Sequence, residues 1–130
     1  MINAKNIYFF KDLTQLKYQE NYYDLHNDYD CTIIDFNGDN LSFKLKKIKD
    51  KTIVILKFSN ASITKINFFN EIGVDRLTIN ILYRGRFEKN GELLDISENN
   101  QSYFYMEFEE GQTIEFWAEN IIIEPYIPKE

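Results

Sequence analysis

The sequence predicts an all-β domain, either an antiparallel sandwich or a closed barrel of about eight or nine strands built from consecutive hairpins. Three observations predict this fold: runs of alternating apolar and polar residues, Gly-containing turns between the runs, and an aromatic content of 16%. The length of 130 residues is that of a single domain, which we expect to span 1–130. At most one short N-terminal helix fits the pattern.

The first hairpin is predicted from two runs, 32–36 and 41–46, on either side of Asn37-Gly38. Asn-Gly readily adopts the positive φ angles of a tight hairpin turn. In the second run the apolar residues occupy alternate positions: Leu41, Phe43 and Leu45. Because successive side chains of a strand point to opposite faces, this run is predicted to be a half-buried strand.

The second hairpin is predicted to run from 77–83 through Asn90-Gly91 to 93–96. Gly85 lies inside this pattern, where a glycine favours a bulge or the close approach of another group.

The third hairpin is predicted to join 103–108 to 113–118 around Glu110-Gly111. Between the first two hairpins, segment 53–58 is apolar on both faces. Such a run is typical of a strand in the middle of a sheet that is covered on each side.

Two segments are ambiguous. After Asp12, a fair N-cap residue, four residues have helical spacing: Leu13, Leu16, Glu20 and Tyr23. A short helix is therefore predicted near the start of the chain. Segment 63–69 is compatible with a strand or a helix, and its β-branched and aromatic residues favour the strand.

Composition and charge argue against several classes of protein. The net charge of −6 argues against a general affinity for nucleic-acid phosphates or anionic membranes. A single Cys excludes an internal disulfide framework and a Cys-rich zinc site. No signal peptide is visible, and aliphatic clusters such as 121–123 are much shorter than the ~20 residues of a membrane span. We therefore expect a cytoplasmic protein that binds neither nucleic acid nor membrane.

The charge is unevenly distributed along the chain. Residues 1–87 contain 13 basic and 10 acidic residues, net +3, whereas 88–130 contain 2 basic and 11 acidic residues, net −9. Six lysines cluster around Asp50: Lys44, Lys46, Lys47, Lys49, Lys51 and Lys57. These runs are either solvated outer faces of strands or patches whose field steers a partner of opposite sign. Both interpretations stay open.

No catalytic constellation is recognised. His26 and Cys31 are the only histidine and the only thiol, and nothing predicts hydrogen-bond reach between them or a third, orienting group. The segment around Gly38 does not match a calcium loop, because its Gly is at the fourth position rather than the sixth. No Gly-rich phosphate loop is present. We therefore predict a non-enzymatic protein with no metal and no cofactor.

Arg84 and Arg86 form a candidate anion site, because residues two apart on a strand point to the same face. Two guanidinium groups so placed can clamp a carboxylate or a phosphate through paired hydrogen bonds. The alternative is an intramolecular pairing with Glu107, Glu109 or Glu115 of a neighbouring strand.

The C-terminal hairpin carries the candidate binding face. Its tyrosines and its tryptophan alternate with the apolar residues of their strands, and acidic residues share their positions. Tyr and Trp side chains can be buried at one end and solvent-exposed at the other, so they are enriched at binding surfaces. The predicted acidic, aromatic patch consists of Tyr103, Tyr105, Glu107, Glu109, Glu115, Trp117 and Glu119. If this face instead packs against another sheet, the row belongs to the core.

These features favour a small non-enzymatic interaction domain that presents the patch to a basic protein surface. Bacterial immunity proteins that neutralise nuclease toxins are of the same general type, being small, acidic and without catalytic residues, although no motif identifies that family here. The alternative is a small-ligand or carbohydrate-binding β domain, which requires a concave, aromatic-lined pocket. An enzyme that uses two carboxylates ranks third. Exposed strand edges are also compatible with a homodimer.

Overall fold

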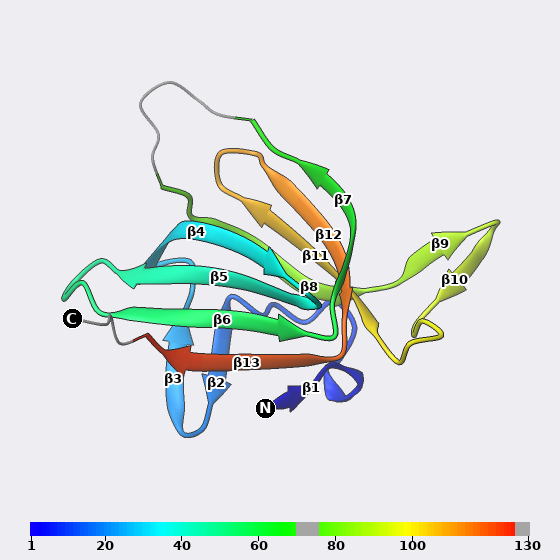
Figure 1. Cartoon of the computed structure of the whole chain (residues 1–130), viewed down its shortest axis with the longest axis horizontal. Coiled ribbons are helices and arrows are strands. Elements are labelled where there is room, and N and C mark those ends of the chain that lie inside the picture. The colour runs from blue at the N-terminus through cyan, green and yellow to red at the C-terminus, as the bar shows by residue number, and fades with distance from the viewer. Residues whose placement is uncertain (70–75, 127–130) are drawn as a thin grey trace.

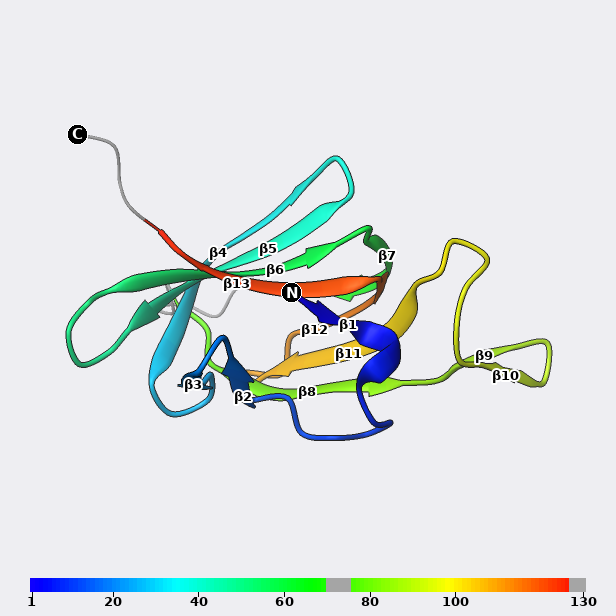
Figure 2. The same ribbon diagram turned by 90° about the horizontal axis from the view of Figure 1, so that it is seen from below.

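Two antiparallel sheets form the two layers of the molecule (Figures 1 and 2). This computed structural model describes residues 1–69 and 76–126. The first sheet has five strands, in the order β1 (Ile2–Asn3), β13 (Asn120–Pro125), β6 (Ile53–Ser59), β5 (Asn40–Lys47) and β4 (Tyr29–Asn37). The second sheet has four strands, in the order β7 (Ser62–Asn67), β12 (Thr113–Ala118), β11 (Ser102–Phe108) and β8 (Ile79–Gly85).

Two short hairpins accompany the sheets and, in the described part of the chain, pair only within themselves. They are β2 (Gln15–Tyr18) with β3 (Asn21–Asp24), and β9 (Phe87–Lys89) with β10 (Glu92–Leu94). The β9–β10 hairpin projects beyond one end of the two layers (Figure 2).

The predicted all-β antiparallel fold is confirmed, and of the two predicted architectures the sandwich fits. Neither sheet closes into a barrel within the described residues. A single bridge between Cys31 and Leu77 joins the edge of β4 to the segment before β8. The described residues form thirteen strands rather than eight or nine, because short pairings such as β1, β9 and β10 add to the long strands.

Most of the predicted strands are present. The first and third hairpins are β4–β5 and β11–β12, and segment 62–67 is the strand β7. Strand β6 lies at the centre of the five-stranded sheet, as its apolar character predicts. The turn between β9 and β10 consists of Asn90 (φ 52°) and Gly91 (φ 81°), which is the pair of positive φ angles expected of an Asn-Gly hairpin.

Two pairs of consecutive strands connect the layers. β6 passes into β7 through Asn60 and Ala61, and β12 passes into β13 through Glu119. Because β6 pairs with β13 and β7 pairs with β12, each pair of strands contributes to both sheets. The inner faces of the two sheets are thereby held against each other.

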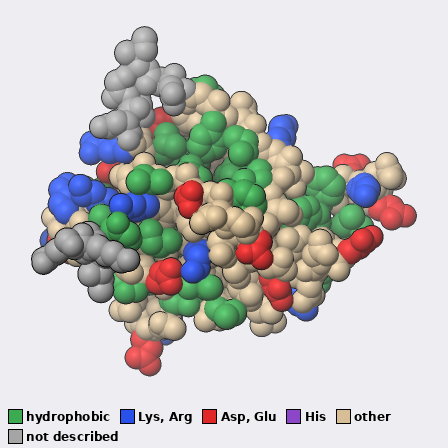
Figure 3. All heavy atoms as spheres, viewed as in Figure 1, with side chains coloured by type: hydrophobic (Ala, Val, Ile, Leu, Met, Phe, Trp, Pro, Cys, Tyr) green, Lys and Arg blue, Asp and Glu red, His purple; other side chains and the backbone are tan. Residues whose placement is uncertain are grey.

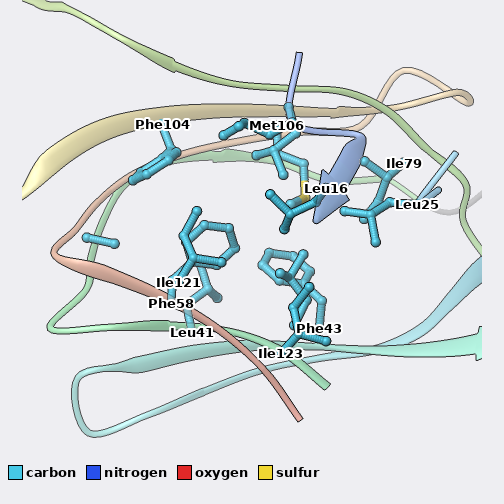
Figure 4. Packing of buried hydrophobic residues seen from close by; sticks show 14 of the residues in the cluster. Leu16, Leu25, Leu41, Phe43, Phe58, Ile79, Phe104, Met106, Ile121 and Ile123 are labelled. Carbon is cyan, nitrogen blue, oxygen red and sulfur yellow. The ribbon is translucent and has the colours of Figure 1, made fainter. Parts of the chain in front are cut away.

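The core is aromatic where the inner faces meet. The Phe58 side chain is fully buried, and its ring centroid lies 4.7 Å from that of Phe116, 5.3 Å from that of Phe104 and 5.9 Å from that of Phe43. Figure 4 shows Phe104 and Met106 reaching from one sheet toward residues of the other. Edge-to-face packing of this kind adds to the stabilisation from burial alone.

The predicted helix near the N-terminus is wrong. Residues 15–24 form the β2–β3 hairpin, and the only helical turn in the described chain is a 3-10 turn at Ala4–Asn6. The Asp12 carboxylate accepts hydrogen bonds from the backbone N–H (2.9 Å) and the hydroxyl (2.7 Å) of Thr14. This closes a local turn instead of capping a helix. Leu16 and Tyr18 are buried while their neighbours are exposed, which is the periodicity of a strand.

The second hairpin also differs from the prediction. Strand β8 pairs with β11 and not with the segment that follows Asn90-Gly91, which belongs to the separate β9–β10 hairpin. Gly85 ends β8, and a Cβ there would lie 3.2 Å from the Tyr83 ring and 3.7 Å from the Phe10 ring. The glycine therefore allows the close approach that the sequence suggested.

Truncation of Phe58 tests the aromatic core. We expect Phe58→Ala to lower the free energy of unfolding by about 3–5 kcal/mol, because it removes a ring packed between both sheets and leaves a cavity. Phe36→Ala is the matched control, since Phe36 is 45% exposed, and should cost about 1 kcal/mol or less. Urea denaturation measures both, and equal losses would contradict this account of the core.

Candidate functional site

The outer face of the four-stranded sheet carries most of the predicted patch. Directly paired residues of antiparallel strands share a face. The register places Tyr83, Tyr105 and Glu115 in one row across β8, β11 and β12. Tyr103 pairs with Trp117 in the next row, and Glu107 lies in the row on the other side. We call these six side chains the platform: Tyr83, Tyr103, Tyr105, Glu107, Glu115 and Trp117.

Two phenol–carboxylate hydrogen bonds organise the platform. The Tyr105 hydroxyl donates to Glu107 Oε1 (2.7 Å), and the Tyr103 hydroxyl donates to Glu115 Oε1. Burial, followed by the hydrogen bond to Glu107, raises the pKa of Tyr105 to about 12. Burial and the bond to Glu115 likewise raise the pKa of Tyr103 far above its ordinary value. At neutral pH the phenols therefore stay protonated donors.

Ring contacts extend the platform at both ends. The Tyr83 and Tyr105 rings are stacked with centroids 5.4 Å apart, and the Phe10 ring lies 5.6 Å from that of Tyr83. At the other end, the Phe87 ring from β9 lies 5.1 Å from that of Tyr103 and 5.6 Å from that of Trp117. The sequence pattern alone did not indicate Tyr83, Phe10 or Phe87 as members of this surface.

One expected member of the exposed row is buried. The Tyr103 side chain is only 6% exposed, because Phe87 and Trp117 pack against its ring. Tyr105 and Trp117 are half-buried on the outer face, as are Glu107 and Glu115. Tyr83 is half-buried as well, so the solvent-accessible part of the platform is formed by Tyr83 and these four side chains.

The two remaining acidic residues of the predicted patch lie away from the platform. Glu109 is exposed at the end of β11, where the chain turns toward β12. Glu119 lies at the crossing from β12 to β13, where its carboxylate accepts hydrogen bonds from Asn60 Nδ2 (3.0 Å) and Asn100 Nδ2 (3.3 Å).

The Arg84 side chain connects strand β8 to two other segments of the chain, 5–7 and the segment around Asp95. Its guanidinium donates to the carbonyl oxygens of Lys5 (3.3 Å), Ile7 (3.0 Å) and Asp95 (3.3 Å), and the side chain is 5% exposed. Arg86 forms an ion pair with Asp95 (3.1 Å). Both guanidinium groups lie over the Phe9 ring, at 4.3 and 4.5 Å from its centroid. A clamp on an external anion stays a prediction.

The carboxylates of the platform have no cationic partner among the described residues. The ion pairs found there are Lys57–Glu124, Arg76–Asp30 and Arg86–Asp95. The alternative pairing of Arg84 or Arg86 with Glu107, Glu109 or Glu115 is therefore not found. Lys65 is opposite Glu115 in the register of β7 and β12 but does not approach it within ion-pair distance.

A groove adjoins the platform at Trp117. It has a volume of 440 Å³ and lies between the β9–β10 hairpin, loop 96–101 and the edge of the four-stranded sheet. Its apolar walls are Phe87, Leu94, Ile96 and Trp117. The concavity that a small-ligand domain requires is therefore present beside the platform rather than over it.

The lysine-rich segment forms a separate surface. Lys46, Lys47 and Lys51 line a pocket of 170 Å³ together with Asp30 and Arg76. Figure 3 shows basic side chains gathered at this end of the molecule, around the β5–β6 turn. This basic surface is distinct from the platform, although Lys57 of the lysine cluster pairs with Glu124 of the acidic part of the chain.

Cys31 and His26 are not combined into a nucleophilic pair. Burial raises the pKa of the Cys31 thiol to about 12, so this thiol stays protonated at neutral pH. The His26 Nδ1 atom lies 2.9 Å from the carbonyl oxygen of Ile79. Within 1–69 and 76–126, no three His, Cys, Asp or Glu side chains gather as metal ligands, and no helix has the length and apolar character to cross a membrane.

Comparison with known proteins adds no relative: no protein-family model matches the chain, and no curated protein matches it. The function is therefore argued from the geometry of the platform and of the groove.

Removal of the Glu107 charge tests the phenol–carboxylate pair. Because the carboxylate favours the neutral phenol, Glu107→Gln should lower the pKa of Tyr105 from about 12 toward its ordinary value near 10. Glu109→Gln, which removes an exposed charge outside the platform, should leave it unchanged. NMR titration of 13C-labelled tyrosine measures the pKa of Tyr105 in each of the two variants.

The same pair makes stability depend on pH. Since the folded state retains a proton that the unfolded state releases above pH ~10, the free energy of unfolding should fall as the pH rises from about 10 to about 12. The fall should be shallower in Glu107→Gln than in the unmodified chain, and an identical slope would show that Tyr105 does not titrate as described.

Substitution of Arg84 tests its role as a connection between segments. We expect Arg84→Met to lower the free energy of unfolding by about 2 kcal/mol, because three carbonyl groups lose a charged donor. Arg86→Met, at a 42% exposed side chain with a surface ion pair, should cost about 1 kcal/mol or less. If the two variants lose the same stability in urea denaturation, the buried contacts of Arg84 do not contribute as proposed.

Proposed function

We propose that this protein is a non-enzymatic interaction domain whose platform binds a basic surface of another protein. The observation that carries the proposal is the state of the platform carboxylates: Glu107 and Glu115 are held by tyrosine hydroxyls and have no cationic partner among the described residues. Each carboxylate keeps its negative charge and has a second oxygen that is not engaged by the phenol. A lysine or arginine of a partner can supply the missing charge.

The shape and composition of the platform support the same proposal. Tyr105 and Trp117 offer half-exposed rings beside the carboxylates, on the rigid outer face of a four-stranded sheet. Aromatic side chains contribute contact area with little loss of conformational entropy. Charges on such a surface mainly raise the rate of association and select partners of opposite sign. The part of the chain that forms β11 and β12, residues 88–130, is also its acidic part.

An NMR titration with an oligo-arginine peptide tests the location of binding. We expect amide shifts to concentrate on β8, β11 and β12, and the affinity to fall steeply with added salt because the Debye length is only ~10 Å at 0.1 M. Glu107→Lys should weaken binding about tenfold, and Glu107→Gln by a smaller factor.

Glu20→Lys provides the matched control, since it reverses an exposed charge in the β2–β3 turn and should have little effect. Circular dichroism confirms that each variant is folded. Shifts confined to other surfaces, or an affinity that ignores both salt and Glu107, would show that the platform is not the binding face.

A further inference from the structure

The groove beside the platform is continuous with it. Trp117 belongs to both, and the Phe87 ring, which also lines the groove, packs against Trp117 and against Tyr103 of the platform. No described element separates the ring surfaces of the platform from the apolar walls of the groove. A partner that covers the platform therefore also reaches the mouth of the groove.

The loop that forms the floor of the groove is held by its own hydrogen bonds. The Ser97 hydroxyl donates to Gln101 Oε1 (3.0 Å), and Gln101 Nε2 donates to the carbonyl oxygen of Asn60 (2.9 Å). Asn60 Nδ2 in turn donates to the carbonyl oxygen of Asn99 (3.1 Å). The groove is thus formed before any ligand enters, so that little conformational entropy is lost on binding.

These hydrogen bonds also restrict what the groove can hold. A sugar needs several free donors and acceptors around its ring, but the deep amide of Gln101 and the hydroxyl of Ser97 already have partners. What remains is apolar surface on Phe87, Leu94, Ile96 and Trp117, together with the polar side chains of Lys89, Glu98 and Asn99. The groove therefore suits an apolar stem better than a polyhydroxylated ligand.

The Glu98 carboxylate in the lining of the groove offers a partner to a cation at the end of that stem. Glu98 lines the rim, and Glu115 of the platform is on the same strand as Trp117, two residues before it. Lys89 also lines the rim, opposite in charge to Glu98. A planar guanidinium stacks on an aromatic face and keeps its charge, and Trp is the strongest aromatic partner of a cation. The chain itself places two guanidinium groups over the Phe9 ring.

We propose that the groove between the β9–β10 hairpin and Trp117 accepts an arginine side chain of the basic partner. This inference rests on the proposed function, because it names the group by which a partner bound to the platform is anchored. The aliphatic stem lies along the apolar walls formed by Leu94, Ile96 and Trp117, and the guanidinium faces Glu98.

The test uses a blocked Gly-Arg-Gly peptide and a counterpart in which citrulline, which is neutral and nearly isosteric, replaces arginine. Trp117 is the single tryptophan of the chain, so its fluorescence reports on the groove and the adjoining end of the platform, and a variant of Glu98 distinguishes the two. We expect a saturable fluorescence change with the arginine peptide and at least about fivefold weaker binding of the citrulline peptide. Glu98→Gln should weaken binding of the arginine peptide about threefold, whereas Glu92→Gln, which removes an exposed charge of the β9–β10 hairpin, should not.

The outcomes separate this inference from the proposed function. Equal binding of the two peptides would overturn the inference, because the groove would then be a site for a neutral ligand. No fluorescence change with the arginine peptide, while an oligo-arginine peptide still shifts β8, β11 and β12, would overturn the groove assignment and leave the platform intact. Binding of the arginine peptide to a chain whose platform ignores oligo-arginine would support the groove and contradict the proposed function.

Discussion

The architecture depends on two pairs of strands that belong to both sheets. β6–β7 and β12–β13 cross between the layers through very short connections, so the strand pairing on one side fixes the pairing on the other. The inner faces are forced together at Phe58, whose ring contacts phenylalanines of both sheets. With the apolar faces joined in this way, the outer face of the four-stranded sheet is left to carry polar and aromatic side chains, and these form the platform.

On the platform, carboxylates and aromatic rings lie side by side, and this affects the hydration of the carboxylates. A carboxylate next to aromatic rings loses part of its hydration, which raises the free energy of the charged form. Here each of the two phenols donates a hydrogen bond that compensates the carboxylate beside it without neutralising its charge. Of the nearby cations, Arg84 binds backbone carbonyls and Arg86 pairs with Asp95, while Lys65 lies opposite Glu115 without reaching ion-pair distance. The negative charge of the face is therefore kept for interactions outside the chain.

Strict alternation made the strand β5 predictable, at Leu41, Phe43 and Leu45, and the dipeptide Asn90-Gly91 made a tight turn predictable, because both signals are local. The helix after Asp12 was mispredicted since Leu16 and Tyr23 satisfy helical and hairpin spacing alike, and only the tertiary packing decides between them.

Tyr83 is absent from the predicted patch for another reason. The register between β8 and β11 shifts near Asn80, so that Ile79 and Leu82 both face inward and Tyr83 faces the platform. Nothing in the local pattern reveals such a bulge. Phe87 was missed because its hairpin pairs with neither sheet, and its contact with Tyr103 is purely tertiary.

Because the β9–β10 hairpin pairs with neither sheet, its sequence can vary with little effect on the rest of the fold. Its strands contribute no pairing to either layer in the described chain, and its tip, Asn90-Gly91, is exposed. Length and sequence changes at such a tip alter a neighbouring surface without loss of sheet pairing. The side of the groove that this hairpin forms can thus change independently of the four-stranded sheet, which carries Trp117. We expect related chains to differ in ligand preference mainly at this hairpin, because such changes cost little stability.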